Sequence, residues 1–104
     1  MYWVDKKYHK AATVRFVWDD DKRKSNLEKH GVDFADAHAF EWATALVVDD
    51  DREDYGEARQ VATGFVGERI YVMVFTDRDS QRRVISFRKA NKREIRSYVE
   101  SIQS

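Results

Sequence analysis

A basic segment near the C-terminus carries the side chains best suited to phosphate chemistry. Alternation along a strand there puts Val84, Ser86 and Arg88 on one face, and Ile85 and Phe87 on the other, which fits packing against a helix. Arginine stays protonated and can hold two phosphate oxygens at once. We therefore expect Arg88 to bind phosphate and to stabilise the negative charge of a transition state.

The neighbours of Arg88 leave alternatives open. Ser86 is either a hydrogen-bond donor to phosphate or an ordinary strand residue. Arg83 falls on the opposite face from Arg88, at the start of the strand, where it either binds phosphate from the rim or is ordinary surface. Lys89 follows Arg88 and adds a further phosphate-binding cation. The alternative for Arg88 itself is a structural role, in an ion pair with Glu57 or an aspartate at the edge of the sheet.

Candidate proton-transfer groups come from two other segments. His30 ends a predicted helix, and imidazole titrates near neutral pH, which suits an acid–base catalyst. Cations are also favoured at a helix C-terminus, so this position explains Lys29 and His30 without any chemistry. Glu57 and Arg59 are two residues apart on a strand and therefore point the same way. They form either a general base beside a phosphate-binding cation or a simple salt bridge.

The first helix adds a polar stripe. Lys22 and Asn26 are four residues apart and share a face, with Lys29 and His30 close by. The stripe either follows a nucleic-acid backbone or is solvated. Three scattered histidines without any cysteine argue against zinc, and the acidic run Asp49–Asp54 lacks the spacing and glycine of an EF-hand. We expect no cofactor.

A predicted α+β fold positions these groups. A short strand over residues 14–18 precedes a helix that Asp19 caps and Gly31 ends. This helix is expected to be largely exposed, because Leu27 is its only large aliphatic residue. Asp33 caps a second helix, whose apolar face consists of Phe34, Ala37, Phe40 and Trp42.

An antiparallel sheet and a closing helix follow. We expect the strands over residues 45–49, 59–66, 69–76 and 83–88, with a tight turn at Gly67–Glu68. Asn91 caps the last helix, and Glu94 completes a capping box. The buried stripe of this helix is expected to be Ile95, Tyr98, Val99 and Ile102. One domain over residues 14–104, preceded by an N-terminal extension of residues 1–13, is the predicted organisation.

Charge is segregated along the chain. The 104 residues include 19 basic and 19 acidic ones, so the net charge is zero. Residues 41–57 are nonetheless strongly acidic, with Arg52 as their only base, and residues 82–96 are strongly basic, with Glu94 as their only acid. Such a basic segment can hold phosphates locally, while the acidic one limits indiscriminate binding. Ordinary solvated surface is the alternative interpretation of both.

Composition also excludes several classes of protein. The absence of cysteine excludes disulfide frameworks and thiolate metal sites. No stretch approaches the roughly 20 apolar residues that cross a bilayer. Residues 1–13 contain several charges and lack the apolar run of a secretory signal. We expect a cytoplasmic protein without a membrane partner.

Three elements of fixed spacing resemble the BrnT family of toxins. The first is Trp18-Asp19-x-x-Lys22-x-x-x-Asn26-x-x-Lys29-His30-Gly31-Val32-x-Phe34. The second, which Gly64 follows, is Asp54-Tyr55-Gly56-Glu57-x-Arg59. The third, which continues to Lys92-Arg93-Glu94 and Tyr98, is Arg83-Val84-Ile85-Ser86-Phe87-Arg88-Lys89-Ala90. The resemblance covers roughly residues 14–98. The departures from the family pattern are residues 1–13 and Phe87, where relatives often carry a small residue.

The resemblance implies a RelE-like ribonuclease fold and the toxin of a type II toxin–antitoxin system. Such a toxin cleaves RNA without a metal ion and arrests translation. The resemblance also implies neutralisation by a BrnA-like antitoxin with a ribbon-helix-helix DNA-binding region. Operator DNA would then be bound only through the antitoxin, and the pair would repress its own promoter.

Metal-independent RNA cleavage assigns roles to the candidate residues. The 2′-hydroxyl must lose a proton, the phosphorane needs cations, and the 5′-oxygen must gain a proton. The expected catalytic residues are Arg88, His30, Glu57 and Arg59, and the sequence leaves open which is the acid and which the base. Contacts with RNA phosphates are expected from Lys22, Lys29, Arg83, Ser86 and Lys89.

Two other classes of protein fit the same residues. A non-catalytic module that binds nucleic acid or a protein partner would keep the basic segment without the chemistry. A structural or interaction protein would dock the acidic run Asp49–Asp54 on a basic partner. That run is equally a candidate for contact with the antitoxin.

Overall fold

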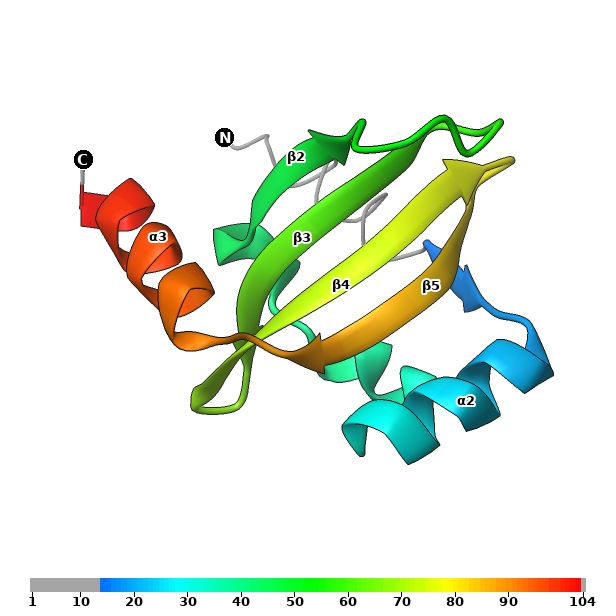
Figure 1. Cartoon of the computed structure of the whole chain (residues 1–104), viewed down its shortest axis with the longest axis horizontal. Coiled ribbons are helices and arrows are strands. Elements are labelled where there is room, and N and C mark those ends of the chain that lie inside the picture. The colour runs from blue at the N-terminus through cyan, green and yellow to red at the C-terminus, as the bar shows by residue number, and fades with distance from the viewer. Residues whose placement is uncertain (1–13, 104) are drawn as a thin grey trace, which may run out of the picture.

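A five-stranded sheet is the centre of the computed structural model, which describes residues 14–103 (Figure 1). Its strands are β1 (Arg15–Val17), β2 (Leu46–Asp50), β3 (Arg59–Val66), β4 (Arg69–Arg78) and β5 (Gln81–Lys89). They lie in the order β1-β5-β4-β3-β2, with β1 parallel to β5 and the other neighbours antiparallel. The α+β class and the Gly67–Glu68 turn are confirmed, while β4 ends two residues later and β5 begins two residues earlier than predicted. The predicted extension, residues 1–13, lies outside the described residues.

Helix α2 (Asp20–His30) forms as the sequence predicts. The Asp19 carboxylate accepts the backbone N–H of Asp21 at 2.8 Å, and Gly31 ends the helix in the left-handed region, with φ at 70°. The helix is largely exposed, and Asn26 is its only buried residue. No helix among the described residues is long and apolar enough to cross a membrane.

The predicted second α-helix is wrong in type. The chain instead forms two short 3₁₀ segments, η1 (Phe34–Ala39) and η2 (Trp42–Thr44). Between them Phe40 forms a bridge to Val66, and the backbone N–H of Glu41 donates to the carbonyl of Phe65. Pairing with the end of β3 therefore replaces helical hydrogen bonds at this point.

The apolar face predicted for that segment still builds the core. Phe34, Ala37 and Phe40 are buried against one face of the sheet, and Trp42 packs at the margin of the cluster. The buried residues that the sheet contributes are Ala62, Met73, Phe75, Val84 and Phe87.

Strand β5 contains a bulge that simple alternation does not reveal. Its pairing with β4 passes directly from Ser86 to Val84, so Ile85 has no partner. The extra residue reverses the alternation on its N-terminal side. Val84 and Phe87 therefore both point into the core, where both are fully buried. The prediction that Val84 shares the face of Arg88 is wrong.

The same bulge returns Arg83 to the face of Arg88. Arg83 lies opposite Thr76, and Arg88 lies opposite Val72. Thr76 and Val72 are an even number of residues apart on β4, so they point to the same side. The prediction that Arg83 falls on the other face is therefore wrong, and both arginines lie on the side away from the core.

Helix α3 (Lys92–Gln103) begins with the predicted capping box. The Glu94 N–H donates to Asn91 Oδ1 at 2.8 Å, and the Asn91 N–H donates to Glu94 Oε1 at 2.9 Å. The buried stripe is shorter than predicted, because α3 lies at one end of the sheet and does not cross it (Figure 1). Tyr98 is buried and donates to the carbonyl of Thr44, whereas Ile95 and Ile102 are 38% and 57% exposed.

Candidate active site on the open face of the sheet

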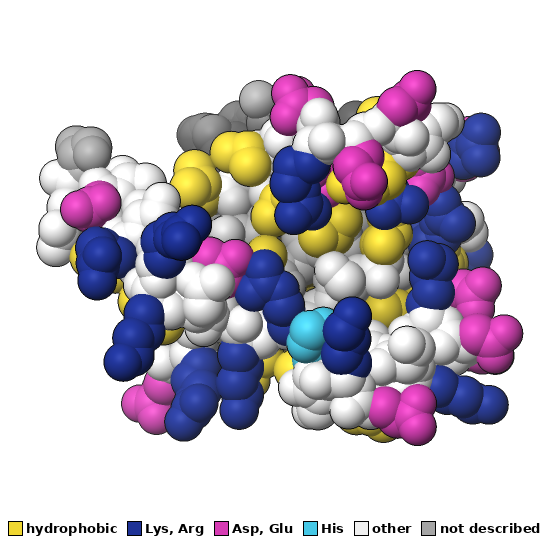
Figure 2. All heavy atoms as spheres, viewed as in Figure 1, with side chains coloured by type: hydrophobic (Ala, Val, Ile, Leu, Met, Phe, Trp, Pro, Cys, Tyr) yellow, Lys and Arg dark blue, Asp and Glu magenta, His cyan; other side chains and the backbone are white. Residues whose placement is uncertain are grey.

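One face of the sheet packs on the core, and none of the described helices crosses the other (Figure 1). We call this second side the open face. Figure 2 shows apolar side chains in its middle, bordered by basic and acidic ones. The residues of β3, β4 and β5 that strand pairing assigns to this face include Arg59, Val61, Val72, Val74, Thr76, Arg83, Ser86 and Arg88.

Glu57 joins two arginines at one end of the open face. Its carboxylate accepts from Arg83 Nη2 at 2.5 Å and from Arg59 Nε at 3.2 Å. The Arg59 guanidinium lies over the ring of Tyr55, 4.0 Å from its centroid. Glu57 and Arg59 thus point the same way, as predicted, and Arg83 joins them. We call the side chains of Glu57, Arg59 and Arg83 the Glu57 centre.

A cleft of about 500 Å³ opens beside the Glu57 centre. Its walls come from the ends of β1, β4 and β5 and from the segment 56–58, and they include Glu57, Thr76 and Arg83. The cleft carries carboxylate, guanidinium and hydroxyl groups together. A phosphate and its neighbouring sugar could therefore meet both donors and acceptors there.

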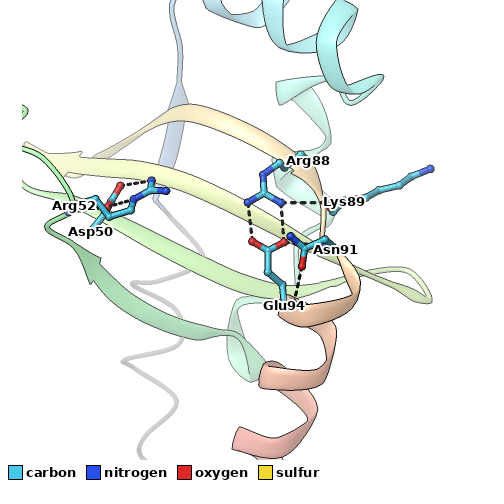
Figure 3. A network of polar contacts seen from close by, with 6 residues as sticks. All are labelled: Asp50, Arg52, Arg88, Lys89, Asn91 and Glu94. Atoms are coloured by element: carbon cyan, nitrogen blue, oxygen red, sulfur yellow. Dashed lines mark hydrogen bonds and ion pairs between the residues drawn. The ribbon is translucent and has the colours of Figure 1, made fainter.

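Arg88 lies at the other end of the open face and is paired with Glu94 (Figure 3). Two parallel hydrogen bonds of 2.8 Å join its guanidinium to the two carboxylate oxygens. This pairing raises the pKa of Arg88, and it holds the pKa of Glu94 below its usual value although burial opposes that shift. The ion pair weighed for Arg88 exists, but its partner is Glu94 and not Glu57 or an aspartate. Arg88 and Glu94 form the Arg88 centre.

A shallow groove of about 230 Å³ runs from the Arg88 centre across the sheet. Valines form its floor, and the Asp50–Arg52 ion pair closes its far side (Figure 3). Asp50 is buried, and its hydrogen bonds with Arg52 lower the pKa of its carboxyl. The floor consists of Val48, Val61, Val72 and Val74.

The two centres lie on the same face of the sheet but at separate positions. Arg83 and Arg88 lie opposite residues four apart on β4, which corresponds to about 13 Å. Ser86 lies between them, opposite Val74, and is half-buried. The open face therefore offers two separate cationic positions at the ends of an apolar floor.

His30 is the last residue of α2 and is close enough to Arg88 for the charge of that guanidinium to act on its imidazole. The pKa of its imidazole is lowered, because partial burial disfavours the charged ring and because the cations Lys29 and Arg88 repel it. Neutral imidazole therefore predominates at pH 7.

The remaining predicted phosphate contacts are scattered. Lys22 and Lys29 are exposed on α2. Asn26, which the sequence placed in the same stripe, is buried and points towards β5, so the stripe does not include it. Lys89 lies opposite Tyr71 and therefore on the other face of the sheet from Arg88.

Sequence reasoning missed three features of the site. Glu94 was recognised only as a helix cap, although a carboxylate six residues after Arg88 at a helix start is within its reach. The Asp50–Arg52 pair was missed, and its signal was the isolated base in the acidic segment. Asn26 was mistaken for a surface residue because it lies on an otherwise exposed helix.

Among residues 14–103, no three or more His, Cys, Asp or Glu side chains are gathered so that they could hold a metal ion.

One protein family matches the chain. Its model covers residues 18–94, about three quarters of the sequence, and describes the ribonuclease toxin BrnT of type II toxin–antitoxin systems. The matched range contains both centres of the open face. No protein with curated annotation matches the chain.

Proposed function

The chain belongs to the BrnT family of ribonuclease toxins of type II toxin–antitoxin systems, and we propose that the open face of its sheet is where it cleaves RNA, without a metal ion. The observation that carries this proposal is the pairing of Arg88 with Glu94. A guanidinium that holds two carboxylate oxygens has the geometry to hold two phosphate oxygens instead. The Glu57 centre offers a second position of the same kind.

In this proposal the reacting phosphate binds at Arg88, which is close enough to His30 for its charge to act on the imidazole. Neutral imidazole there can take the proton from the 2′-hydroxyl, and Arg88 offsets the charge of the phosphorane. The 2′-oxygen bonds to phosphorus, the bond to the 5′-oxygen breaks, and that oxygen takes up a proton from water, while the imidazolium of His30 returns its proton to solvent. The products are a 2′,3′-cyclic phosphate and a 5′-hydroxyl end.

The Glu57 centre then holds a neighbouring part of the RNA. Arg59 and Arg83 bind its backbone, and Glu57 fixes the orientation of both guanidinium groups. In the alternative arrangement the reacting phosphate lies between Arg59 and Arg83, and Glu57 acts as the general base. A Glu57→Gln variant separates the two arrangements.

Family membership implies an antitoxin partner and an RNA substrate. The finer proposal is a BrnA-like ribbon-helix-helix antitoxin that brings the complex to operator DNA and represses the promoter, with RNA cleavage that arrests translation in the cytoplasm. The resemblance of the three sequence elements supports it. A RelE-like fold belongs to the same proposal, and the antiparallel β2 to β5 sheet with a C-terminal helix supports it.

Cleavage of purified RNA in excess chelator tests the proposed function. We expect cyclic phosphate ends, and we expect no cut where the attacking 2′-hydroxyl is replaced by hydrogen. Cleavage that requires an added metal, or that proceeds at the deoxy position, would contradict the proposal.

A further inference from the structure

Asn26 joins α2 to β5 through its buried side-chain amide. Its Nδ2 donates to the carbonyl of Val32 at 2.9 Å and to the carbonyl of Phe87 at 2.7 Å. Its Oδ1 accepts the backbone N–H of Phe87 at 3.1 Å. The residue is only 6% exposed. Both amide hydrogens and the amide oxygen are thus engaged in directional contacts.

These bonds complete the outer edge of β5. Strand β1 pairs only with Gln81–Arg83, so it does not reach Phe87. At Phe87 the amide both donates and accepts, as the backbone of a neighbouring strand would. A side chain of α2 therefore takes the place of a strand at the position just before Arg88.

The amide connects the two segments that carry His30 and Arg88. His30 follows Asn26 by four residues on α2, so the two lie on one side of the helix. Arg88 follows Phe87 directly. Elsewhere α2 is weakly docked, because Leu27 is 45% exposed and Asn26 is the only buried residue of the helix. The Arg23–Asp33 ion pair is a further attachment, but it lies near the other end of α2.

We propose that Asn26 is a positioning residue of the ribonuclease site, which fixes His30 relative to Arg88. The inference rests on the proposed function, in which both groups act on one phosphate. An apolar side chain at position 26 would fill the same space, but it would leave the N–H and the carbonyl of Phe87 without these bonds and would not fix the orientation of α2. An amide with three directional bonds also fixes the rotation and the translation of the helix.

The test compares Asn26→Asp with Val84→Ala. The aspartate has the same shape and keeps the acceptor for Phe87, but it loses both donated bonds. Val84→Ala removes core volume from the same strand without touching these bonds. We expect Asn26→Asp to lower kcat about 100-fold, the effect of a misplacement of about 1 Å, with KM unchanged. Val84→Ala should lower the melting temperature but keep kcat at temperatures where it is folded.

A His30→Gln background distinguishes positioning from a general loss of structure. If Asn26 acts through His30, Asn26→Asp should cost nothing further once His30 is replaced. An equal loss of kcat in both backgrounds would overturn the inference, and so would an unchanged kcat in a folded Asn26→Asp protein. If the aspartate variant does not fold, Asn26→Ala, which buries no charge, is measured in the same two backgrounds.

An NMR titration of His30 supplies a readout that does not require cleavage. Burial of the ring lowers its pKa, as do the charges of Lys29 on α2 and Arg88 on β5, and Glu94 is paired with Arg88. In Asn26→Ala, which introduces no charge that would itself raise this pKa, release of the helix end should move the His30 midpoint up towards the ordinary value. An unchanged midpoint in the Asn26 variant would contradict the positioning role. Wild-type protein that cuts no RNA would instead contradict the proposed function and leave the titration result valid.

Discussion

Arg83 and Arg88 lie on the same face of the sheet although an odd number of positions separates them. The bulge at Ile85 supplies the extra residue that makes this possible. Without it, Arg83 would lie on the core side, and Glu57 would lose one of its two guanidinium partners. The electrostatic character of the open face therefore depends on one irregularity of β5.

Replacement of Arg88 by alanine should abolish growth arrest. The variant loses the cation that offsets the phosphorane charge, and removal of one such group lowers kcat about 10²–10³-fold. Arg88→Lys should retain only part of the activity, because an ammonium group cannot hold two oxygens in parallel. Arg69→Ala, at an exposed position where β4 begins, is the matched control and should remain toxic. A folded Arg88→Ala protein with full toxicity would remove Arg88 from the site.

Glu57→Gln should raise KM and leave kcat nearly unchanged. The amide no longer orients Arg59 and Arg83 by charge, so binding of the neighbouring RNA weakens while the reacting groups at Arg88 stay in place. Steady-state cleavage of a short RNA measures both constants. A loss of kcat of about 10²–10⁴-fold with KM unchanged would instead identify Glu57 as the general base.

The pH profile of cleavage should show an acid limb that belongs to His30. Its pKa is lowered from 6.5, so the neutral, proton-accepting form is present at pH 7 and is lost as the pH falls through the lowered pKa. Activity should therefore decline on the acid side at a lower pH than an unshifted imidazole would give. His30→Gln should reduce cleavage at pH 7 and lack this limb. If the limb persists in that variant, another group carries the proton.

Gly64→Ala should destabilise the fold without altering the site directly. A Cβ on Gly64 would lie 2.9 Å from Cζ of Phe40 and 3.1 Å from Cβ of Ala45. Phe40 is buried in the core, so its ring cannot move away freely. We expect a loss of about 1–3 kcal/mol in the free energy of unfolding. Urea denaturation measures it, and an unchanged midpoint would mean that the Phe40 ring adapts at no cost.

Much of the fold was predictable because local signals determine it. Asp19, Gly31 and the Asn91–Glu94 capping box set helix ends through contacts within a few residues. The bounds of β3 follow from its composition and from the turn at Gly67. The type of the segment after Asp33 was not predictable, because the pairing of Phe40 and Glu41 with the end of β3 decides it.

The sequence could name candidate residues but not their arrangement. Residue type singled out Arg88, His30, Glu57 and Arg59, and their catalytic roles stay predictions. Alternation then misplaced Arg83, because a bulge is a property of the paired strands. The sequence also could not show that Asn26 points inward, since that requires knowing which strand passes beside α2.

A map of bound RNA on the full chain tests the central claim most directly. The probe is a fully 2′-O-methylated RNA oligonucleotide, which keeps its phosphates but has no nucleophile. The readout is the NMR signal of each arginine Nε. We predict shifts at Arg88, Arg59 and Arg83 and none at Arg82, whose guanidinium lies over Trp42 on the core side. A shift of the Arg82 signal without shifts at Arg59, Arg83 and Arg88 would contradict the account.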